Sequence, residues 1–259
     1  MLFKRIVYFQ YKKFNMNNFS ILKDLAKKLD EEVVILVSDL DNIPKDSIER
    51  DLINEGINYK IEVKSSLDEG IEFVKSYSPD LLVLTKEKID PLEHIFHHTY
   101  CEKILEEFES TNILALQEDT DTLKNGLIYV SKDHSTVDFI KSSKYFADRV
   151  LENYKFIYSF YEDFYEKRLV KTHTEGEAKQ IIAEMFREHV DTVRSLIAKA
   201  VGEEKTELLV IKGDPKKEIP YYARKNNYDL LIFNRGVEDI NSFIENSETS
   251  IGIFLDQTK

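Results

Sequence analysis

The chain contains two copies of one segment, and this repeat limits what it can fold into. SPDLLVLTK at residues 78–86 and NYDLLIFNR at residues 227–235 carry an aspartate, four apolar residues, a polar residue and a basic residue in the same order. Internal self-similarity marks a chain built from copies of one structural unit. With 259 residues there is room for two ordinary domains. We therefore predict homologous domains at residues 1–118 and 124–259, joined by the polar segment QEDTDTLKN.

Short apolar runs alternate with helical patterns along both predicted domains. The runs of the first lie at residues 5–10, 32–38, 59–63, 80–84 and 112–116, and those of the second at residues 126–131, 155–160, 207–213, 229–233 and 250–255. This alternation is typical of a parallel α/β sheet. We expect each domain to hold a five-stranded, mostly parallel sheet with helices on both faces.

The longest helical pattern covers residues 175–201. Its apolar residues recur at helical spacing and predict a buried stripe along one side. The stripe consists of Ile181, Ile182, Met185, Phe186, Val193, Leu196 and Ile197. His189 stands between Glu188 and Val190, and from these neighbours we expect it on the surface.

Composition excludes several classes of protein. The net charge of −12 argues against nucleic acid or an anionic membrane as the main partner. No apolar run approaches the ~20 residues that a membrane span needs, and the N-terminal MLFKRIVYFQYKK is typical of a strand rather than a signal peptide. A single cysteine allows no internal disulfide and suits a reducing compartment. We expect a soluble cytoplasmic protein.

A family resemblance follows from the second copy of the repeat. KGDPKKEIPYYARKNNYDLLIFNRG at 212–236 resembles the universal stress protein signature, in which Gly-Asp-Pro opens a helix that leads to an Asp-Leu-Ile-Val-like strand. In the first half, YSPDLLVLTKEK is similar to the same strand of the family, and TYCEKILEEFESTNILAL resembles its closing helix and last strand. The resemblance therefore covers nearly the whole chain, as two copies of the family domain. From its place at the start of the helix, Asp214 is expected to be a helix cap.

The resemblance implies both a fold and a site. The fold would be two flavodoxin-like, Rossmann-like domains of the adenine nucleotide alpha hydrolase-like type. The ligand crevice would lie where the strands end, at the switch point of each sheet. The last strands, NILAL at 112–116 and SIGIFL at 250–255, would pair across the domain boundary. The tandem chain would then be an internal pseudo-dimer.

Many members of this family bind ATP through an aspartate after the first strand and a Gly-x2-Gly-x9-Gly-Ser/Thr loop after the fourth. The glycines let backbone N–H groups approach the phosphates. In the first half the three glycines fall on Thr85, Lys88 and His98, and only Thr99 keeps the expected hydroxyl. The aspartate positions fall near Tyr11 and Ser131.

In the second half Asn234, Arg235 and Gly236 stand where the loop should begin. Too few residues remain before the last strand for the spacer, the Gly-Ser pair and a full helix, so we expect a shortened connection. Both loops are therefore predicted to be degenerate, and no cofactor is expected. If a nucleotide does bind, Thr99, Asn234 and Gly236 are the remaining candidate contacts.

The segment PLEHIFHHTYCEK at 91–103 holds the other candidate site. His94, His97, His98 and Cys101 are spaced as one helical stripe, and imidazole and thiolate ligands suit Zn²⁺. The competing interpretation is a buried cysteine at the start of the closing helix beside solvated loop histidines. The same spacing therefore fits a zinc site or no site.

Seven aromatic residues crowd the segment 153–168, namely Tyr154, Phe156, Tyr158, Phe160, Tyr161, Phe164 and Tyr165. They exceed what one strand can bury, and we expect part of them to pack between domains or subunits. His134, in SKDHST, follows the strand at 126–131 and is therefore expected at the mouth of the second crevice.

No catalytic motif occurs, neither a Gly-x-Ser-x-Gly elbow nor a Walker loop, so we do not expect an enzyme. The sequence favours a non-catalytic, universal stress protein-like protein for stress response or regulation that binds a protein partner or a second copy of itself. An ATP-binding member with a divergent loop and slow hydrolysis is the first alternative. A metal- or redox-responsive switch is the second.

Overall fold

The computed structural model describes residues 3–11, 13–38, 45–86, 100–202 and 207–256. The first half holds β1 (Ile6–Tyr11), α1 (Met16–Leu29), β2 (Val33–Ser38), α2 (Lys45–Asn54), β3 (Tyr59–Lys64), α3 (Leu67–Tyr77), β4 (Leu81–Lys86), α5 (Tyr100–Glu107) and β5 (Asn112–Gln117). The second half holds β6 (Asn125–Tyr129), α6 (Val137–Val150), β7 (Asn153–Phe160), α7 (Glu162–Leu169), α8 (Glu175–Val201), β8 (Leu208–Lys212), α9 (Pro215–Lys225), β9 (Leu230–Asn234), α10 (Ile240–Asn246) and β10 (Ser250–Phe254).

All ten strands form one sheet in the order β3-β2-β1-β4-β5-β10-β9-β6-β7-β8. Neighbouring strands within each half run parallel, as the alternating sequence pattern predicts. The halves meet where β5 and β10 pair antiparallel, with Leu114 opposite Gly252. The expected pairing of the two last strands across the domain boundary is therefore confirmed, and so is the α/β class.

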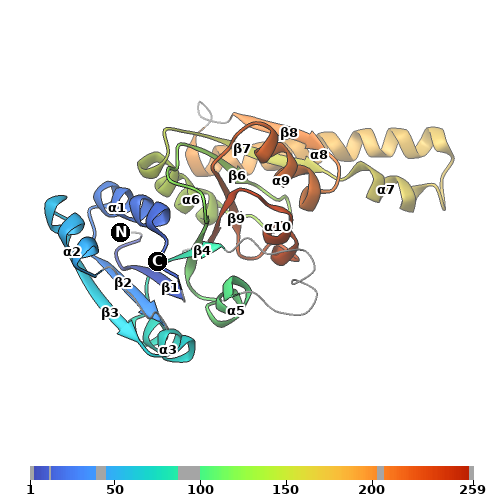
Figure 1. The fold of residues 1–259 in the computed structure, drawn as a ribbon. Helices are drawn as coiled ribbons and strands as arrows, with labels where there is room; N and C mark the ends of the chain where they lie inside the picture. The colour runs from blue at the N-terminus through green and yellow to red at the C-terminus, as the bar shows by residue number, and fades with distance from the viewer. Residues whose placement is uncertain (1–2, 12, 39–44, 87–99, 203–206, 257–259) are drawn as a thin grey trace.

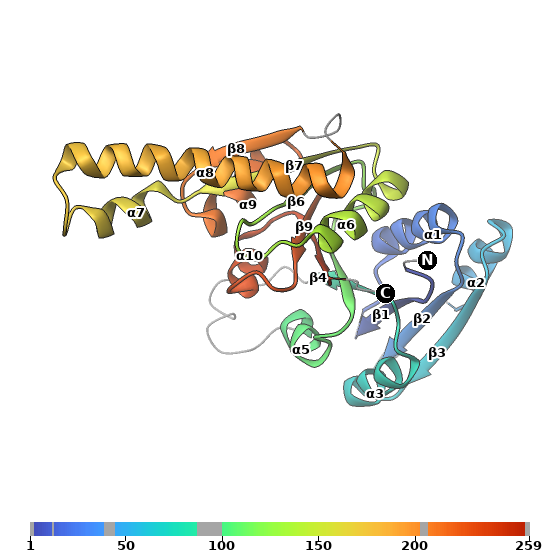
Figure 2. The same ribbon diagram turned by 180° about the vertical axis from the view of Figure 1, so that it is seen from behind.

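Helices cover both faces of this sheet (Figures 1 and 2). One apolar core lies under α1, α2, α6 and α8, and the other lies under α3, α5, α9 and α10. Both cores run through the two halves, and α1 contacts α6 across the junction. Because apolar side chains of both halves share each core, we expect the two halves to unfold together.

Helix α8 has the bounds that the sequence predicts. Thr174 caps its start: its hydroxyl accepts from the Glu177 amide while Glu177 accepts from the Thr174 amide, and this reciprocal pair fixes where the helix begins. With α7, the N-terminal part of α8 extends beyond the sheet as a helical hairpin (Figure 1). The corresponding helix of the first half, α2, is only 10 residues long.

The repeated aspartates hold the first strand of each half. An Asp80 carboxylate oxygen accepts from the Arg5 amide at 3.1 Å, and an Asp229 oxygen accepts from the amides of Lys124 and Asn125 at 2.9 and 2.8 Å. These amides precede or begin β1 and β6. The aspartate of the repeat therefore has a structural role in both halves.

The repeated basic residues, Lys86 and Arg235, both reach across the junction between the halves. Lys86 Nζ donates to the carbonyls of Ile244 and Ser247 at the end of α10, the latter at 2.6 Å. Arg235 donates from its guanidinium to the carbonyl of Leu105 in the last turn of α5. Each cation thus binds the C-terminus of the closing helix of the other half, where the helix dipole favours positive charge.

Replacing Lys86 with methionine tests this contact. The variant keeps the aliphatic stem but loses the ammonium that donates both hydrogen bonds at a helix end, which should lower the free energy of unfolding by about 1–2 kcal/mol. Urea denaturation of the Lys86→Met variant measures this change. Lys217→Met, on the exposed face of α9, is the control and should stay near the wild type. Equal losses in both variants would show that the cross-junction contact contributes nothing.

Candidate functional site

Each half has a switch point in its part of the sheet, and the region beyond the strand ends there, where the family resemblance places a ligand, is called the first or the second crevice. The strand order reverses between β1 and β4 in the first half and between β6 and β9 in the second. At such switch points the loops leave to opposite faces of the sheet and open a space beyond the strand ends. Of the residues at the nucleotide-loop positions, Thr85 lies in β4, and Asn234, Arg235 and Gly236 lie at and just after the end of β9. Lys88, His98 and Thr99 lie outside the described residues.

Side chains occupy the first crevice and bond to one another. Gln10 Nε2 donates to Thr85 Oγ1 at 3.0 Å, and Thr85 Oγ1 donates to Asn18 Oδ1 at 2.7 Å. Gln10 and Asn18 are fully or almost fully buried. Thr85, at the first glycine position of the family loop, therefore fills space that a glycine would leave open, and its hydroxyl is engaged in this network.

The same network ties the crevice to the junction. Asn18 Nδ2 donates to the carbonyls of Gln117 and Thr120 at 2.9 and 3.1 Å. Two buried polar side-chain atoms of the described residues lack a partner, Ser143 Oγ and one guanidinium nitrogen of Arg235. Neither atom belongs to this network, so the side-chain amides of Gln10 and Asn18 have no unpaired buried donor that could bind a ligand.

Two aromatic rings stack at the end of β1, beside the first crevice. Tyr11, at the position of the family's aspartate, stacks on Tyr100 with ring centroids 5.5 Å apart. The Tyr100 hydroxyl donates to the carbonyl of Phe9 at 3.1 Å. A ring therefore stands where the family places a carboxylate.

In the second crevice the loop amides after β9 have internal partners. The Arg235 amide donates to the Phe254 carbonyl at 2.8 Å and the Val237 amide to the Asn234 carbonyl at 3.1 Å. Between them, the Gly236 amide donates to Asn234 Oδ1 at 2.6 Å. The two candidate contacts Asn234 and Gly236 are thus bonded to each other. These amides lie at the end of β9 and just after it, where the family resemblance places the start of the phosphate loop.

A carboxylate lies beside this loop. Asp256 Oδ1 accepts from Asn234 Nδ2 at 2.7 Å and from Thr136 Oγ1 at 2.6 Å. Thr136 is the N-cap of α6, so this carboxylate sits close to a helix N-terminus, where anions are favoured. An incoming phosphate would meet a group of its own charge there.

The first half carries an acidic residue at the matching position. Ile113 pairs with Leu82 and Ile251 with Leu231, which aligns Glu118 with Asp256. Glu118 forms an ion pair with Lys13 after β1, and its carbonyl accepts from Asn15 Nδ2 at 2.9 Å. Sequence analysis singled out neither carboxylate, because each becomes part of its crevice only when the last strand is in place.

The loop between β6 and α6 closes the second crevice from the other side. Ser131, at the second aspartate position, is buried, and its amide donates to Ser135 Oγ at 2.9 Å. The carbonyl of His134 lies 3.9 Å from where a Cβ on Gly236 would stand. His134 therefore lies at the crevice mouth, as expected. Asp214 is the N-cap of α9 and accepts from the Lys216 amide at 3.1 Å, which confirms its expected role.

The candidate metal ligands are only partly within the described structure. His94, His97, His98 and the candidate contact Thr99 lie outside the described residues, and so does the side chain of Cys101. Among the residues that the structure describes, no group of three His, Cys, Asp or Glu side chains could hold a metal ion. The zinc site stays a prediction.

The expected surface position of His189 is wrong. His189 is only 4% exposed, and its Nδ1 lies 2.9 Å from the Tyr158 hydroxyl. The rings of Phe160 and Tyr165 stand edge-on to the imidazole at centroid distances of 5.4 and 5.7 Å. Burial, more than the nearby Lys132, lowers the pKa of His189 below its usual value. Asp133 and Glu188 oppose this shift.

This aromatic cluster also accounts for most of the crowded segment 153–168. Phe156, Tyr158 and Phe160 belong to the core under α8, and Tyr154 donates to Asp148 of α6 at 2.7 Å. Phe164, in α7, is 39% exposed. The pairs named here lie within the second half, although the core under α8 also includes residues of the first half. Packing of these aromatic residues between subunits stays a prediction.

Comparison with known proteins rests on structure alone, since no family model and no curated protein sequence matches the chain. A protein of Pseudomonas aeruginosa UCBPP-PA14, provisionally assigned as a universal stress protein, matches 98% of this chain and 93% of its own, with a TM-score of 0.72 and 12% identity. PA1789 of Pseudomonas aeruginosa PAO1, described as functionally unknown, gives the same coverage, a TM-score of 0.71 and 13% identity.

A universal stress protein of Archaeoglobus fulgidus DSM 4304 matches 96% of both chains, with a TM-score of 0.57 and 13% identity. At these identities the likeness establishes the fold. The chain has the universal stress protein fold in two copies, as the sequence resemblance implies. Among the described residues, no helix is long and apolar enough to cross a membrane.

Proposed function

We propose that this chain is a cytoplasmic, non-catalytic regulatory protein of the universal stress protein type, serving in a stress response through protein binding rather than nucleotide binding. One observation carries this proposal: the amides of residues 235–237, at the start of the expected phosphate loop, donate hydrogen bonds within the protein. The polar network of Gln10, Thr85 and Asn18 supports the same conclusion for the first crevice.

Nucleotide binding in the second crevice would require these contacts to open. The phosphate would have to displace Asn234 from the Gly236 amide, at about 1 kcal/mol for each hydrogen bond lost. It would also approach the Asp256 carboxylate, whose oxygen Asn234 and Thr136 already engage. A ligand gains little from backbone donors that are already paired. The one unpaired guanidinium nitrogen of Arg235 belongs to a side chain that reaches toward the end of α5.

A thermal melt of metal-stripped protein with and without excess Mg-ATP tests the proposal. A ligand at 100 times its Kd adds about 2.7 kcal/mol, which is ~5–10 °C at the usual 2–4 °C per kcal/mol for a chain of this size. We expect no change in Tm. A shift of several degrees would instead establish the alternative, an ATP-binding protein with a divergent loop.

A double variant identifies the crevice responsible for any shift in Tm. Asn234→Gly with Asp256→Ala frees the Gly236 amide and removes the carboxylate, and it should bind Mg-ATP better than the wild type if these groups block the site. Should the wild type itself show a shift that this double variant leaves unchanged, the nucleotide binds outside the second crevice. Circular dichroism of the double variant confirms that it remains folded.

A further inference from the structure

The two outer strands of the sheet differ in how they are protected. β3 carries Lys60, Glu62 and Lys64 along its length, and Glu62 forms ion pairs with both lysines at 2.7 and 3.5 Å. Charges on an edge strand discourage pairing with another chain. β8, the other edge, reads LLVIK and has no charge before Lys212. Charged side chains therefore protect the β3 edge against pairing with another chain, and the β8 edge has no such charge before Lys212.

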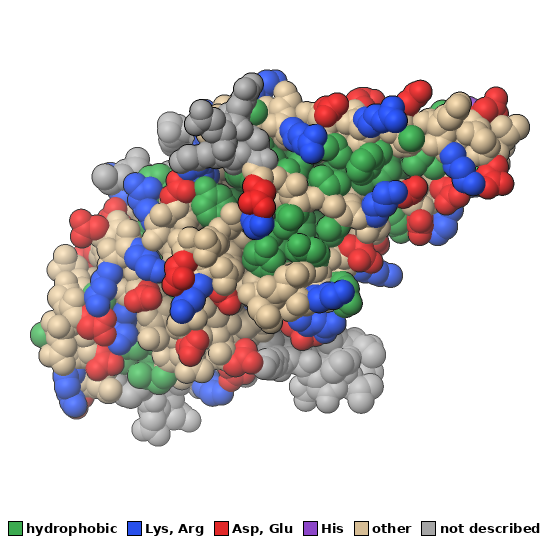
Figure 3. Space-filling model, turned by 90° about the horizontal axis from the view of Figure 1, so that it is seen from above, with side chains coloured by type: hydrophobic (Ala, Val, Ile, Leu, Met, Phe, Trp, Pro, Cys, Tyr) green, Lys and Arg blue, Asp and Glu red, His purple; other side chains and the backbone are tan. Residues whose placement is uncertain are grey.

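The apolar residues of β8 are incompletely covered. Leu208 and Val210 face the core under α8, Leu209 and Ile211 face the core under α9, and all four are only half-buried. Figure 3 looks onto this side and shows apolar side chains gathered between the helices that flank the edge. Tyr221 of α9, the helix that follows β8 in the chain, is 50% exposed. A continuous apolar edge of this kind marks an interaction surface.

The hydrogen bonds to β7 show which groups of β8 face outward. The Phe156 amide donates to the Glu207 carbonyl at 3.3 Å, and the Gly213 amide donates to the Phe160 carbonyl at 3.0 Å. Residues 207 and 213 thus point to β7, and alternate residues of a strand point to opposite sides. It follows that Leu208, Val210 and Lys212 direct their backbone N–H and C=O groups away from the sheet.

We propose that β8 is the self-association site of this protein, where two copies pair their β8 strands antiparallel about a two-fold axis at Val210. In this register Val210 faces Val210 of the second copy, and Leu208 faces Lys212. All three outward residues then exchange backbone hydrogen bonds. The proposal rests on the proposed function, a binding protein, and names its partner as a second copy of the chain.

Charge favours a second copy as the occupant. The strand is flanked by Glu207 at its start and Lys212 at its end, so antiparallel pairing brings the acidic end of one copy beside the basic end of the other. Within the chain, these residues are already neutralised by Lys155 and Glu162. A chain with net charge −12 repels its own copies over most of its surface, but at β8 the local charges are balanced. The β5–β10 junction shows the same antiparallel joining of two parallel sheets.

Light scattering after size-exclusion chromatography measures the mass in solution. We expect the wild type at twice the mass of the chain. Val210→Pro removes an outward N–H and keeps the β7–β8 ladder, so it should be monomeric with a cooperative melt. The matched control is Val63→Pro on β3, where the Val33 amide donates to Asn58 and so places the Val63 N–H outward in the same way. This variant should remain dimeric.

A charge exchange tests the axis. Val210→Lys and Val210→Glu should each be monomeric, because like charges would face each other, and an equal mixture should recover the dimer. A monomeric wild type, or a dimer that survives Val210→Pro, would overturn the proposal, as would a mixture that stays monomeric while both variants are folded. The Mg-ATP melt reports on the crevices alone, so a dimer that binds ATP would contradict the proposed function and leave this site standing.

Discussion

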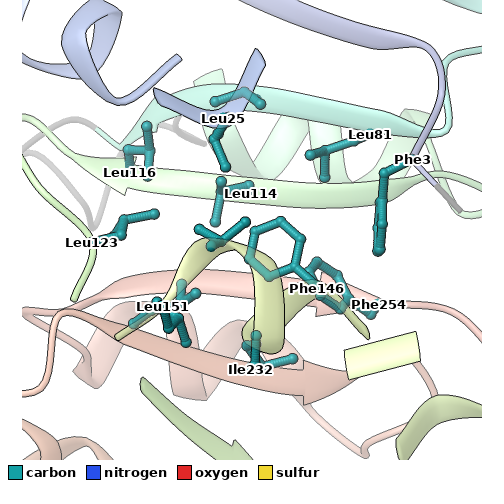
Figure 4. Packing of buried hydrophobic residues seen from close by; sticks show 14 of the residues in the cluster. Phe3, Leu25, Leu81, Leu114, Leu116, Leu123, Phe146, Leu151, Ile232 and Phe254 are labelled. Atoms are coloured by element: carbon teal, nitrogen blue, oxygen red, sulfur yellow. The ribbon is translucent and has the colours of Figure 1, made fainter. Parts of the chain in front are cut away.

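Phe254→Ala is expected to lower the free energy of unfolding by about 3–5 kcal/mol, the cost of a large cavity in a well-packed core. Phe254 ends β10 and is fully buried. Its ring lies 5.3 Å from that of Phe3, at the start of the first half, and 5.1 Å from that of Phe146 in α6 (Figure 4). The side chain therefore packs against both halves at once.

Differential scanning calorimetry should show one transition that moves to lower temperature in the variant. Because both cores run through the two halves, the loss should destabilise the whole chain rather than one domain. Two separate transitions, one of them at the wild-type temperature, would contradict this and show that the halves fold independently. Tyr221→Ala is the control, since a half-exposed ring on α9 should change the stability by no more than about 0.5 kcal/mol.

The sequence predicts the sheet well because the signals for it are local. Apolar runs mark the buried strands and the repeated DLL element marks the duplication, so the strand positions and the two halves follow without long-range information. The pairing of the two last strands is implied by the family resemblance instead. The contacts of Lys86 and Arg235 do not follow in this way. Both residues are visible in the repeat, but their partners, at the ends of α10 and α5, lie in the opposite half.

The residues of the candidate site also divide into those that local sequence signals predict and those whose partners lie far away in the chain. Missing glycines at Thr85 and Asn234 predict degenerate loops, and both side chains form hydrogen bonds within the protein at the ends of their strands. Asn234 followed two residues later by Gly236 is the spacing of an Asx-turn, a signal that could have predicted the bond between them. Asp256 and Asn18 carry no such signal, because their partners are more than 20 positions away along the chain.

His189 was misplaced for a different reason. It stands seven residues after Ile182, three after Phe186 and four before Val193, so helical periodicity places it on the buried stripe of α8. The charged neighbour Glu188 indicated a surface position instead. In a helix, adjacent residues face different directions, so periodicity is the better guide.

The buried imidazole should therefore matter for stability. His189→Ala is expected to lower the free energy of unfolding by about 2–4 kcal/mol near neutral pH, through the cavity and the loss of the Tyr158 partner. His189→Gln keeps a hydrogen-bonding group beside Tyr158 and should lose less. Urea denaturation compares these variants with His173→Ala in the exposed turn before α8, where we expect little change.

The pH dependence of the free energy of unfolding tests whether the titration of the His189 imidazole, and not only its packing, affects stability. Burial lowers the pKa of His189 in the folded chain, so near pH 6 the unfolded chain binds more protons at this residue. Stability from His189 is then complete above the ordinary histidine pKa of about 6.5 and falls as the pH drops toward the lower pKa of the folded state. Because the many carboxylates titrate in every variant, the informative quantity is the difference in stability between the wild type and His189→Gln. This difference should shrink as the solution is acidified below that pH, whereas a difference that stays constant would mean that His189 is as readily protonated in the folded chain as in the unfolded one.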